Sequence, residues 1–297
     1  MSKPEYRCGF IAVVGRPNVG KSTLINAIMG TKISIVTPKP QTTRHRISAV
    51  YTQPDYQAIF VDTPGLHRNA GKAMNRMMNK AAVNALADAD LVLFVTEAFR
   101  FTDEDRAALD RIKQAGRPVI AVMNKIDEVK PKDKLLPLIA AMAERHDFAE
   151  VIPISAQRRL NLDELLALIP AFLPVSPALY PVEMLTDRSE SFRVAELIRE
   201  KLTLFLQQEL PYGLSVQIEL YEKSATGIDV HATIWVERAG QKGIVVGKGG
   251  SMLKEIGRSA RLAIKKQAGV PVHLELWVKV KENWADSEQD LARLGYE

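Results

Sequence analysis

A glycine-rich segment near the N-terminus has the residue types and spacing of a phosphate-binding loop. Residues 15–22 are Gly-Arg-Pro-Asn-Val-Gly-Lys-Ser, which fits the pattern Gly-x-x-x-x-Gly-Lys-Ser/Thr. Glycines in such a loop let successive backbone N–H groups point at phosphate oxygens, and the N-terminus of a following helix adds partial positive charge. We expect Lys21 to reach the β- and γ-phosphates and Ser22 to present its hydroxyl to Mg²⁺. The predicted phosphate-binding residues are Gly15, Arg16, Pro17, Asn18, Val19, Gly20, Lys21, Ser22 and Thr23.

Two further segments offer groups for a magnesium ion and for the γ-phosphate. In the proline-containing loop 37–44 we expect the hydroxyl of Thr43, in preference to that of Thr42, to join the ion when the γ-phosphate is present. The apolar run Ala58–Val61 leads into a turn, where Asp62 can hold Mg²⁺ through water and the Gly65 N–H can bond the γ-phosphate. The turn consists of Asp62, Thr63, Pro64 and Gly65. The predicted metal ligands are Ser22, Thr43 and Asp62, and the predicted catalytic residues are Lys21, Thr43 and Gly65.

A third group of residues favours guanine as the base. Asn124-Lys125-Ile126-Asp127 follows the apolar run Pro118–Met123. The Asp127 carboxylate can accept hydrogen bonds from guanine N1–H and the 2-amino group, whereas adenine would leave it unpaired. Lys125 can pack on the purine, and the backbone of a Ser-Ala turn after Glu150–Ile154 can contact the base oxygen. The predicted base-binding residues are Asn124, Lys125, Asp127, Ser155 and Ala156.

The elements that must position these groups alternate between strand and helix. Short apolar runs typical of buried strands occur at Phe10–Val14, Ala58–Val61, Asp90–Thr96, Pro118–Met123 and Glu150–Ile154, with a further possible strand at Thr31–Val36. Helical periodicity occurs at Thr23–Met29, Met74–Leu86 and Thr102–Ala115. This alternation predicts an α/β fold with a doubly wound, mostly parallel sheet. Ligands bind at the carboxyl ends of strands in such sheets, where all the residues above fall.

Length and composition set outer limits on the class of protein. A chain of 297 residues suggests about two domains, and 46% apolar with 25% charged residues is typical of a globular protein. Cys8 is the single cysteine, which excludes an intramolecular disulfide and a cysteine-based zinc site. No apolar run approaches the roughly 18 residues of a membrane span. The first residues lead directly into the first predicted strand, so we expect no signal peptide.

The second half of the chain has a different pattern of elements. A segment with three prolines, Leu173–Pro181, is typical of a semi-rigid linker. After it we predict a helix, two strands joined at Gly227, two helices and a final strand. The ranges are Glu190–Glu209 for the first helix, Leu214–Leu220 and Asp229–Val236 for the hairpin, a last helix ending near Gln267, and Pro271–Val280 for the final strand.

A second glycine-rich loop in this half indicates nucleic-acid binding. Gly247-Lys248-Gly249-Gly250 is a Gly-x-x-Gly loop before a helix, and a nucleic-acid backbone can pass close over glycines because they have no side chain. Residues 238–281 carry ten basic and two acidic residues, a net charge of +8, although 181–297 as a whole has 16 basic and 17 acidic residues. A basic stripe on a balanced domain is typical of nucleic-acid binding. The predicted RNA-binding residues are Gly247, Lys248, Gly249, Gly250, Lys254 and Arg258.

Two histidines and two tryptophans in the predicted strands are expected to have structural roles and not to bind a metal or a base. His231 and His273 have no second ligand at a metal-binding spacing, so we expect packing or surface roles for both. Trp235 and Trp277 are expected in the core and not as platforms for stacked bases.

These motifs together resemble a known family. Residues 9–172 look like a small GTPase domain, and the second half resembles a type II KH domain. The loop around Thr42 and Thr43, and Leu66 in place of the water-orienting glutamine of Ras-like enzymes, resemble the bacterial ribosome-assembly and tRNA-modification branch. A GTPase domain followed directly by a type II KH domain resembles the Era family of GTPases. We therefore predict a GTPase domain at 1–173, a linker at 174–189 and a KH domain at 190–297.

The resemblance implies a function as well as a fold. It implies a GTP-hydrolysing factor for assembly of the 30S ribosomal subunit and maturation of 16S rRNA, with GTP or GDP and Mg²⁺ as cofactors and a KH domain that binds near the 16S rRNA 3′ end. Family members also associate peripherally with the inner membrane, so the resemblance implies a cytoplasmic protein with that association; we expect a monomer. Asn18 matches an asparagine with which relatives hold a potassium ion, and the other interpretation is that it shapes the loop.

Two other functions remain open from the sequence. One is a relative of the tRNA-modification GTPases, but those carry an extra catalytic domain with a terminal cysteine motif, and Cys8 is the single cysteine here. The other is an RNA chaperone whose phosphate-binding loop senses a nucleotide without significant turnover. GTP turnover distinguishes this chaperone from a GTPase.

Overall fold

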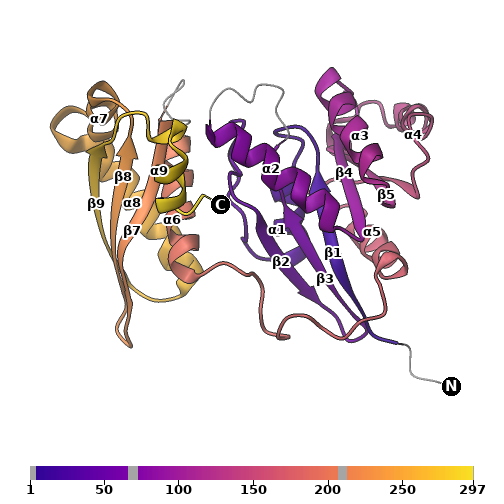
Figure 1. Ribbon diagram of the computed structural model, residues 1–297, viewed down its shortest axis with the longest axis horizontal. Coiled ribbons are helices and arrows are strands. Elements are labelled where there is room, and N and C mark those ends of the chain that lie inside the picture. The colour runs from indigo at the N-terminus through magenta and orange to yellow at the C-terminus, as the bar shows by residue number, and fades with distance from the viewer. Residues whose placement is uncertain (1–4, 66–72, 207–212, 297) are drawn as a thin grey trace. The chain divides into compact units, whose positions relative to one another are not determined.

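The computed structural model describes residues 5–65, 73–206 and 213–296, which fall into two compact units (Figure 1). Among the described residues, the first unit comprises 5–65 and 75–187. The second unit is built mainly from Arg188–Glu297. Within the described residues, no helix combines the length and the apolar character needed to cross a membrane.

The first unit contains a six-stranded sheet with the strand order β2-β3-β1-β4-β5-β6. All neighbouring pairs are parallel except β2 and β3, which pair antiparallel. This arrangement confirms the predicted α/β fold with a mostly parallel sheet. The strands are β1 (Arg7–Val14), β2 (Ile47–Thr52), β3 (Tyr56–Asp62), β4 (Leu91–Glu97), β5 (Val119–Asn124) and β6 (Glu150–Pro153).

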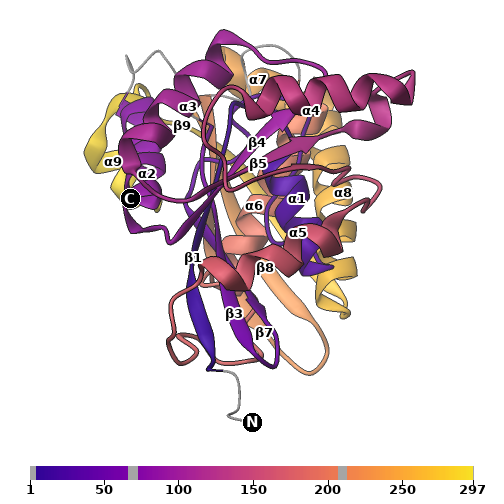
Figure 2. The same ribbon diagram turned by 90° about the vertical axis from the view of Figure 1, so that its right-hand side faces the viewer.

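Helices cover both faces of this sheet. Figure 2 shows α2 and α3 on one side of the central strands and α1 and α5 on the other. Every residue of β3, β4 and β5 is buried as a result, which explains their continuous apolar sequences. The helix predicted at Thr102–Ala115 is present as α3, and it begins after Thr102, which forms a capping box with Asp105. The helices are α1 (Lys21–Met29), α2 (Ala73–Asp88), α3 (Asp103–Ala115), α4 (Leu135–Ala143) and α5 (Leu162–Leu168).

The predicted strand at Thr31–Val36 is wrong, and the sequence analysis missed β2. Residues 31–36 form no strand, because the side chain of Asn26 takes up their backbone groups. Its Oδ1 accepts hydrogen bonds from the N–H groups of Ile33 and Ser34, and its Nδ2 donates to the carbonyl of Ser34 at 2.8 Å. The alternating apolar residues Ile33 and Ile35 therefore reach the core from a loop, which the side chain of Asn26 holds in place.

The proline-containing segment after the sixth strand is hydrogen-bonded to the sheet along 174–187. Gln57 on β3 has no exposed surface, and its Oε1 accepts the backbone N–H of Leu179 at 2.9 Å. Further along, the Ser48 hydroxyl donates to the carboxylate of Asp187 at 2.9 Å. These residues lie with the first unit. The domain limits at 173 and 189 stay a prediction.

The second unit contains a three-stranded sheet, one face of which forms an apolar core with helices. The strand order is β7-β8-β9, with β8 antiparallel to β7 and parallel to β9. Alternate residues of β8, from Ile228 to Val236, are buried against α6 and α8 in one apolar core. The elements are α6 (Glu190–Phe205), β7 (Leu214–Lys223), β8 (Ile228–Val236), α7 (Ala239–Val246), α8 (Ser251–Ala268), β9 (Val272–Val280) and α9 (Glu288–Arg293). Their order is the predicted one, except that α9 was not predicted.

Side chains on the opposite face of this sheet depart from expectation. The side chain of Trp277 is 43% exposed, so its predicted core position is wrong. On β9 the residues that turn towards the helices are Leu274, Leu276 and Val278, which leaves Trp277 on the other side. Trp235 is half-buried, and its indole N–H donates to the side chain of Gln217 at 2.9 Å.

Candidate nucleotide site and nucleic-acid groove

The loop between β1 and α1 has a shape that requires both of its glycines. A Cβ atom on Gly15 would lie 2.2 Å from the carbonyl oxygen of Val95, closer than any real contact. A Cβ atom on Gly20 would lie 2.3 Å from Nδ2 of Asn124, and Gly20 also has a left-handed φ of 101°. The backbone of β4 and the side chain of Asn124 therefore pack directly on this loop.

Lys21 is a buried cation at the start of α1. Its Nζ donates hydrogen bonds to the carbonyl oxygens of Gly15 and Arg16, both at 2.9 Å. Burial disfavours the charged form and lowers the pKa of Lys21 to about 8, although the carboxylate of Asp62 opposes this shift. A bound anion beside Nζ would further favour the charged form, which is the behaviour expected of a phosphate-binding lysine.

The three predicted metal ligands meet at one point. The Ser22 hydroxyl lies 2.7 Å from Oδ2 of Asp62 and 2.9 Å from the hydroxyl of Thr43. Adjacent ligands of an octahedral Mg²⁺ at its usual bond length lie about 2.9 Å apart, so the two hydroxyls have a suitable separation. Thr42 instead bonds Thr37 within its own loop, with 2.6 Å between the hydroxyls.

The buried carboxylate of Asp62 provides the charge for such an ion. Its Oδ1 is buried and has no hydrogen-bond partner among the described residues. Burial raises the pKa of Asp62, against hydrogen bonds from Ser22 and other groups that lower it. A buried carboxylate oxygen with no partner is costly, and a divalent cation would supply one. The donor set therefore fits Mg²⁺.

Asn124 connects three loops at the carboxyl edge of the sheet. Its Nδ2 donates to the carbonyl of Val19 at 2.9 Å, and its Oδ1 accepts the backbone N–H groups of Lys125 at 2.8 Å and Ala156 at 3.0 Å. The residue is only 2% exposed. Asn124 thus fixes the phosphate loop relative to the segment expected to bind the base. The backbone amide of Ala156 already has this partner, so a contact of the Ser155-Ala156 backbone with the base stays a prediction.

A buried network of charges links the phosphate loop to the same edge. Arg16 donates to the carboxylates of Glu97 and, at 3.0 Å, of Asp105, and Glu97 also accepts a hydrogen bond from Lys125. Burial opposes ionisation of Glu97, but the hydrogen bonds from Lys125 and Arg16 outweigh it and lower the pKa of Glu97. Sequence reasoning missed Glu97, although it ends β4 just as Asp62 ends β3.

A pocket of about 300 Å³ opens over this edge. Its wall also includes Ile35, Val36, Thr37, Pro38 and Gln41, which the sequence analysis did not name as site residues. Asn18 donates a hydrogen bond to the carbonyl of Pro38 there at 2.9 Å. The predicted residues that line it are Pro17, Asn18, Gly20, Lys21, Ser22, Thr23, Thr43, Gly65 and Lys125. The predicted residues that do not line it are Gly15, Arg16, Val19, Asp62, Thr63, Pro64, Asn124, Asp127, Ser155 and Ala156.

Asp127 lies in a short 3₁₀ turn, Ile126–Glu128, and its side chain is half-buried. The turn follows Lys125 directly, at the same edge of the sheet. Leu66, the position of the water-orienting glutamine in Ras-like enzymes, lies outside the described residues.

The second glycine loop, between α7 and α8, has a backbone that favours glycine at three positions. Gly247, Gly249 and Gly250 have left-handed φ values of 73°, 59° and 81°. A Cβ atom on Gly247 would lie 2.6 Å from Cβ of Met252, whereas Gly249 and Gly250 face open space. An extended chain can therefore approach the backbone over these last two glycines, beside the exposed Lys248.

This loop forms one end of a groove of about 480 Å³. Apolar side chains of Leu274 and Leu276 on β9 line it together with cationic side chains on α8. The groove brings together the predicted Gly250, Lys254 and Arg258, and adds Arg261, which sequence reasoning missed. Arg261 follows Arg258 at helical spacing, so the periodicity of α8 could have revealed it. A cationic wall beside an apolar surface suits a single-stranded nucleic acid.

Comparison with known proteins identifies the family. Residues 10–125 match a family model described as 50S ribosome-binding GTPase, and residues 209–285 match a KH domain model. GTPase Era of Marinobacter nauticus is 48% identical over 98% of this chain and 96% of that protein, and GTPase Era of Haemophilus ducreyi is 49% identical over 99% and 97%. The chain belongs to the Era family of GTPases. The resemblance seen in the sequence is therefore confirmed.

Solved structures of Era have the same fold as this chain. A crystal structure of Era in complex with MgGDPNP and nucleotides 1506–1542 of 16S ribosomal RNA has a TM-score of 0.94 and 38% identity, over 98% of this chain and 99% of that one. A single-residue variant of Aquifex aeolicus Era bound to GDP·AlF4⁻ has a TM-score of 0.93 and 37% identity over the same shares. As a member of the Era family, the protein is a GTPase with a KH domain.

The charge network makes a testable prediction for nucleotide binding. Glu97→Gln keeps the shape of the side chain but removes the carboxylate that Arg16 and Lys125 share. Losing a buried charged partner costs several kcal/mol, so we expect affinity for GTP and GDP to fall at least about tenfold. Isothermal titration of each nucleotide measures this change. The matched control is Glu104→Gln, an exposed residue in the first turn of α3, and equal affinities for Glu97→Gln and this control would contradict the role of the network.

Proposed function

We propose that this protein binds and hydrolyses GTP with Mg²⁺ and binds 16S ribosomal RNA during assembly of the 30S ribosomal subunit. The observation that carries the proposal is the presence, in one chain, of a phosphate loop with a fitting Mg²⁺ donor set and a basic Gly-x-x-Gly groove. A full-length relative of the same fold has been solved with a Mg²⁺-bound nucleotide and with 16S rRNA.

In the nucleotide site, each residue has a role that its position supports. Lys21 at the floor of the pocket binds the β- and γ-phosphates, and the N-terminus of α1 adds backbone N–H groups. Ser22 and Thr43 hold the magnesium ion directly, and Asp62 holds it through water. When bound, Mg²⁺ neutralises charge that develops on the phosphates. Gly65, whose Cβ would lie 2.9 Å from Pro17, brings its N–H close to the phosphate loop for the γ-phosphate.

At the other end of the site, the proposed base contacts select guanine. Asp127 accepts hydrogen bonds from guanine N1–H and the 2-amino group, and the stem of Lys125 packs on the purine. The ion pair between Lys125 and Glu97 supports this placement, because it holds the lysine at the rim of the pocket. Asn124 acts as a positioning residue through its bonds to the neighbouring loops.

We further propose that the chain works as two domains. The GTPase domain is 1–173, the segment 174–189 connects it to the rest, and the KH domain is 190–297. In the KH domain, Lys248, Lys254 and Arg258 contact RNA phosphates, while Gly247, Gly249 and Gly250 let the RNA backbone approach. A monomeric state, a cytoplasmic location and peripheral association with the inner membrane stay predictions from the resemblance.

The proposed RNA contact can be tested at the glycine loop. The double variant Lys248→Asp/Gly249→Asp adds negative charge where phosphates must pass, and aspartate tolerates the left-handed φ of Gly249. We expect affinity for an RNA of 16S nucleotides 1506–1542 to fall at least tenfold, with a salt dependence flatter by about one unit of slope for each lost phosphate contact. Fluorescence anisotropy at several salt concentrations measures both quantities.

A matched control changes the net charge of the chain by the same amount elsewhere. Lys113→Asp/Gln114→Asp lies on exposed positions near the end of α3 in the first unit. RNA affinity of this control should equal that of the parent protein, and GTP affinity should be unchanged in the glycine-loop variant. Equal RNA affinity for the glycine-loop variant and the control would place the RNA contact elsewhere.

We also propose that Asn18 holds a potassium ion beside the phosphates. Its left-handed φ of 63° and its bond to Pro38 place its amide at the pocket wall, within reach of the loop that carries Thr43. A monovalent cation there would supply charge that an arginine provides in other GTPases. Single-turnover GTP hydrolysis should be faster in potassium than in matched sodium buffer for the parent, and equal in both for Asn18→Ala. If the parent shows equal rates in the two salts, Asn18 has only a structural role.

A further inference from the structure

The two histidines of the second unit lie close together, although they are far apart in the sequence. β8 and β9 run parallel, with Asp229 opposite His273 and His231 opposite Glu275. Because residues two apart on a strand share a face, these four side chains form a compact square on one face of the sheet. The two histidines have no second ligand at a metal-binding spacing in the sequence, but the pairing of the strands supplies such neighbours in space.

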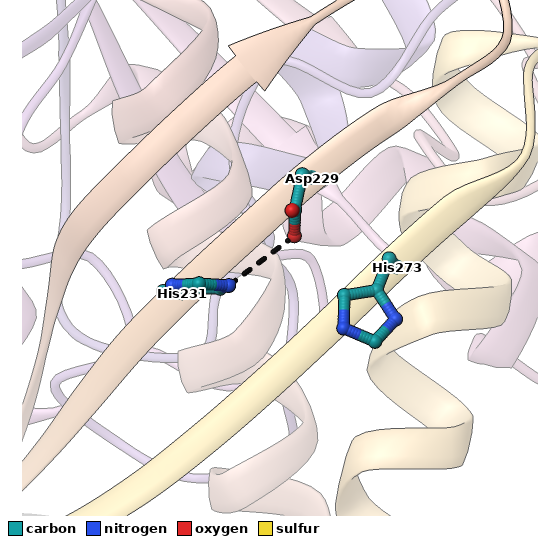
Figure 3. Close-up of side chains that lie close together, drawn as sticks. All are labelled: Asp229, His231 and His273. Atoms are coloured by element: carbon teal, nitrogen blue, oxygen red, sulfur yellow. Dashed lines mark ion pairs between the residues drawn. The ribbon is translucent and has the colours of Figure 1, made fainter.

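The polar atoms of this square converge. The ligand atoms of Asp229, His231 and His273 all lie within 4.8 Å of one another. Figure 3 shows these three side chains on the two neighbouring strands. Nε2 of His231 lies 3.4 Å from Oδ1 of Asp229, and Nε2 of His273 lies 3.3 Å from Oε1 of Glu275. The second carboxylate oxygen of Glu275 is 4.0 Å from Nε2 of His231, so Glu275 faces both imidazoles.

This set of donors matches the needs of a tetrahedral metal ion. Zn²⁺ binds histidine nitrogen and carboxylate oxygen at about 2.0–2.2 Å, which places neighbouring ligands about 3.3–3.6 Å apart. Asp229 and His231 are 3.4 Å apart, His273 and Glu275 are 3.3 Å apart, and the ligand atoms of Asp229, His231 and His273 converge within 4.8 Å. Side-chain rotations would bring these three ligands, with one carboxylate oxygen of Glu275 as the fourth, to one centre. Imidazole with carboxylate suits Zn²⁺ and related transition metals, whereas Mg²⁺ and Ca²⁺ prefer oxygen ligands alone.

A further observation at this square points to a ligand. Oδ1 of Asp229 is shielded from solvent but makes no hydrogen bond among the described residues, because its approach to His231 has poor hydrogen-bond geometry. The imidazole of His231 is also held from the side, since the ring of Trp277 packs against it at 80° with 5.5 Å between centroids. An oriented imidazole beside an unsatisfied carboxylate oxygen is the arrangement that a metal ion completes.

We propose that Asp229, His231, His273 and Glu275 form a binding site for a divalent transition-metal ion, with Zn²⁺ the best fit. The ion joins β8 to β9 across the face of the sheet. Leu274 and Leu276, which alternate with the two β9 ligands, point instead into the nucleic-acid groove. The metal therefore binds on the face opposite the groove and stabilises the strands without blocking RNA.

The test uses the full chain saturated with GDP and Mg²⁺, so that the nucleotide site is filled. Titration with Zn²⁺, followed by calorimetry, should give one ion bound with a dissociation constant in the micromolar range or below, and Zn²⁺ should raise the midpoint of thermal unfolding. Titration with Co²⁺ should give the visible absorption of a tetrahedral complex. We expect His231→Ala and His273→Ala each to weaken Zn²⁺ binding at least 100-fold and to remove the Co²⁺ spectrum.

Two further variants keep the test decisive. His146→Ala removes a histidine of the first unit and should bind Zn²⁺ as the parent does. Glu275→Gln keeps the shape of the side chain, so the variant should fold normally and its circular dichroism spectrum should be unchanged. Weaker Zn²⁺ binding in this variant would therefore reflect the loss of a ligand and not misfolding. Anisotropy should show equal RNA affinity with and without Zn²⁺. Absence of a micromolar site in the parent, or full Zn²⁺ affinity in both histidine variants, would contradict the proposal and leave four side chains that form only ordinary ion pairs on the face of the sheet.

Discussion

The nucleotide site depends on the hydrogen bonds of one buried amide. Asn124 binds the phosphate loop through the carbonyl of Val19 and binds the turn at Ala156 through its backbone N–H. Gly20 must lack a side chain because Nδ2 of Asn124 occupies the place of its Cβ. Two segments more than 100 residues apart in sequence thus have a fixed separation, as a ligand with phosphates at one end and a base at the other requires. Catalysis relies on such preorganised geometry.

The two binding surfaces use positive charge in different ways. In the phosphate loop, Lys21 is buried with a pKa lowered to about 8, and Arg16 is compensated by two carboxylates. Charge at low effective dielectric acts strongly over short distances, so it favours one position of the phosphates. In the groove of the second unit, Lys254 and Arg258 are exposed. Exposed charges are screened by salt and act on a long polyanion, as RNA binding requires.

Features that depend on local sequence were predictable, and features that depend on distant partners were not. The central strands β1, β3, β4 and β5 are covered on both faces, so their apolar runs were evident, as were the glycines of both loops. The strand expected at Thr31–Val36 failed because the side chain of Asn26 replaces a strand partner there. His231 and His273 are 42 positions apart, and only the parallel register of β8 and β9 places them together. α9 has six residues, too few for a clear helical period.

The central claim is that the edge of the sheet around Asn124 forms a guanine site in which Asp127 selects the base. The most direct measurement is the affinity of Asp127→Asn for GTP and for xanthosine triphosphate. Guanine has a 2-amino group that donates a hydrogen bond, whereas xanthine has a 2-oxo group that must accept one from the protein. The account predicts that GTP affinity falls at least about tenfold and that xanthosine triphosphate becomes the preferred ligand. Asp133→Asn, at an exposed position in the 3₁₀ turn Lys132–Lys134, should retain the parental preference. Unchanged GTP affinity in Asp127→Asn, with no gain for xanthosine triphosphate, would contradict the account.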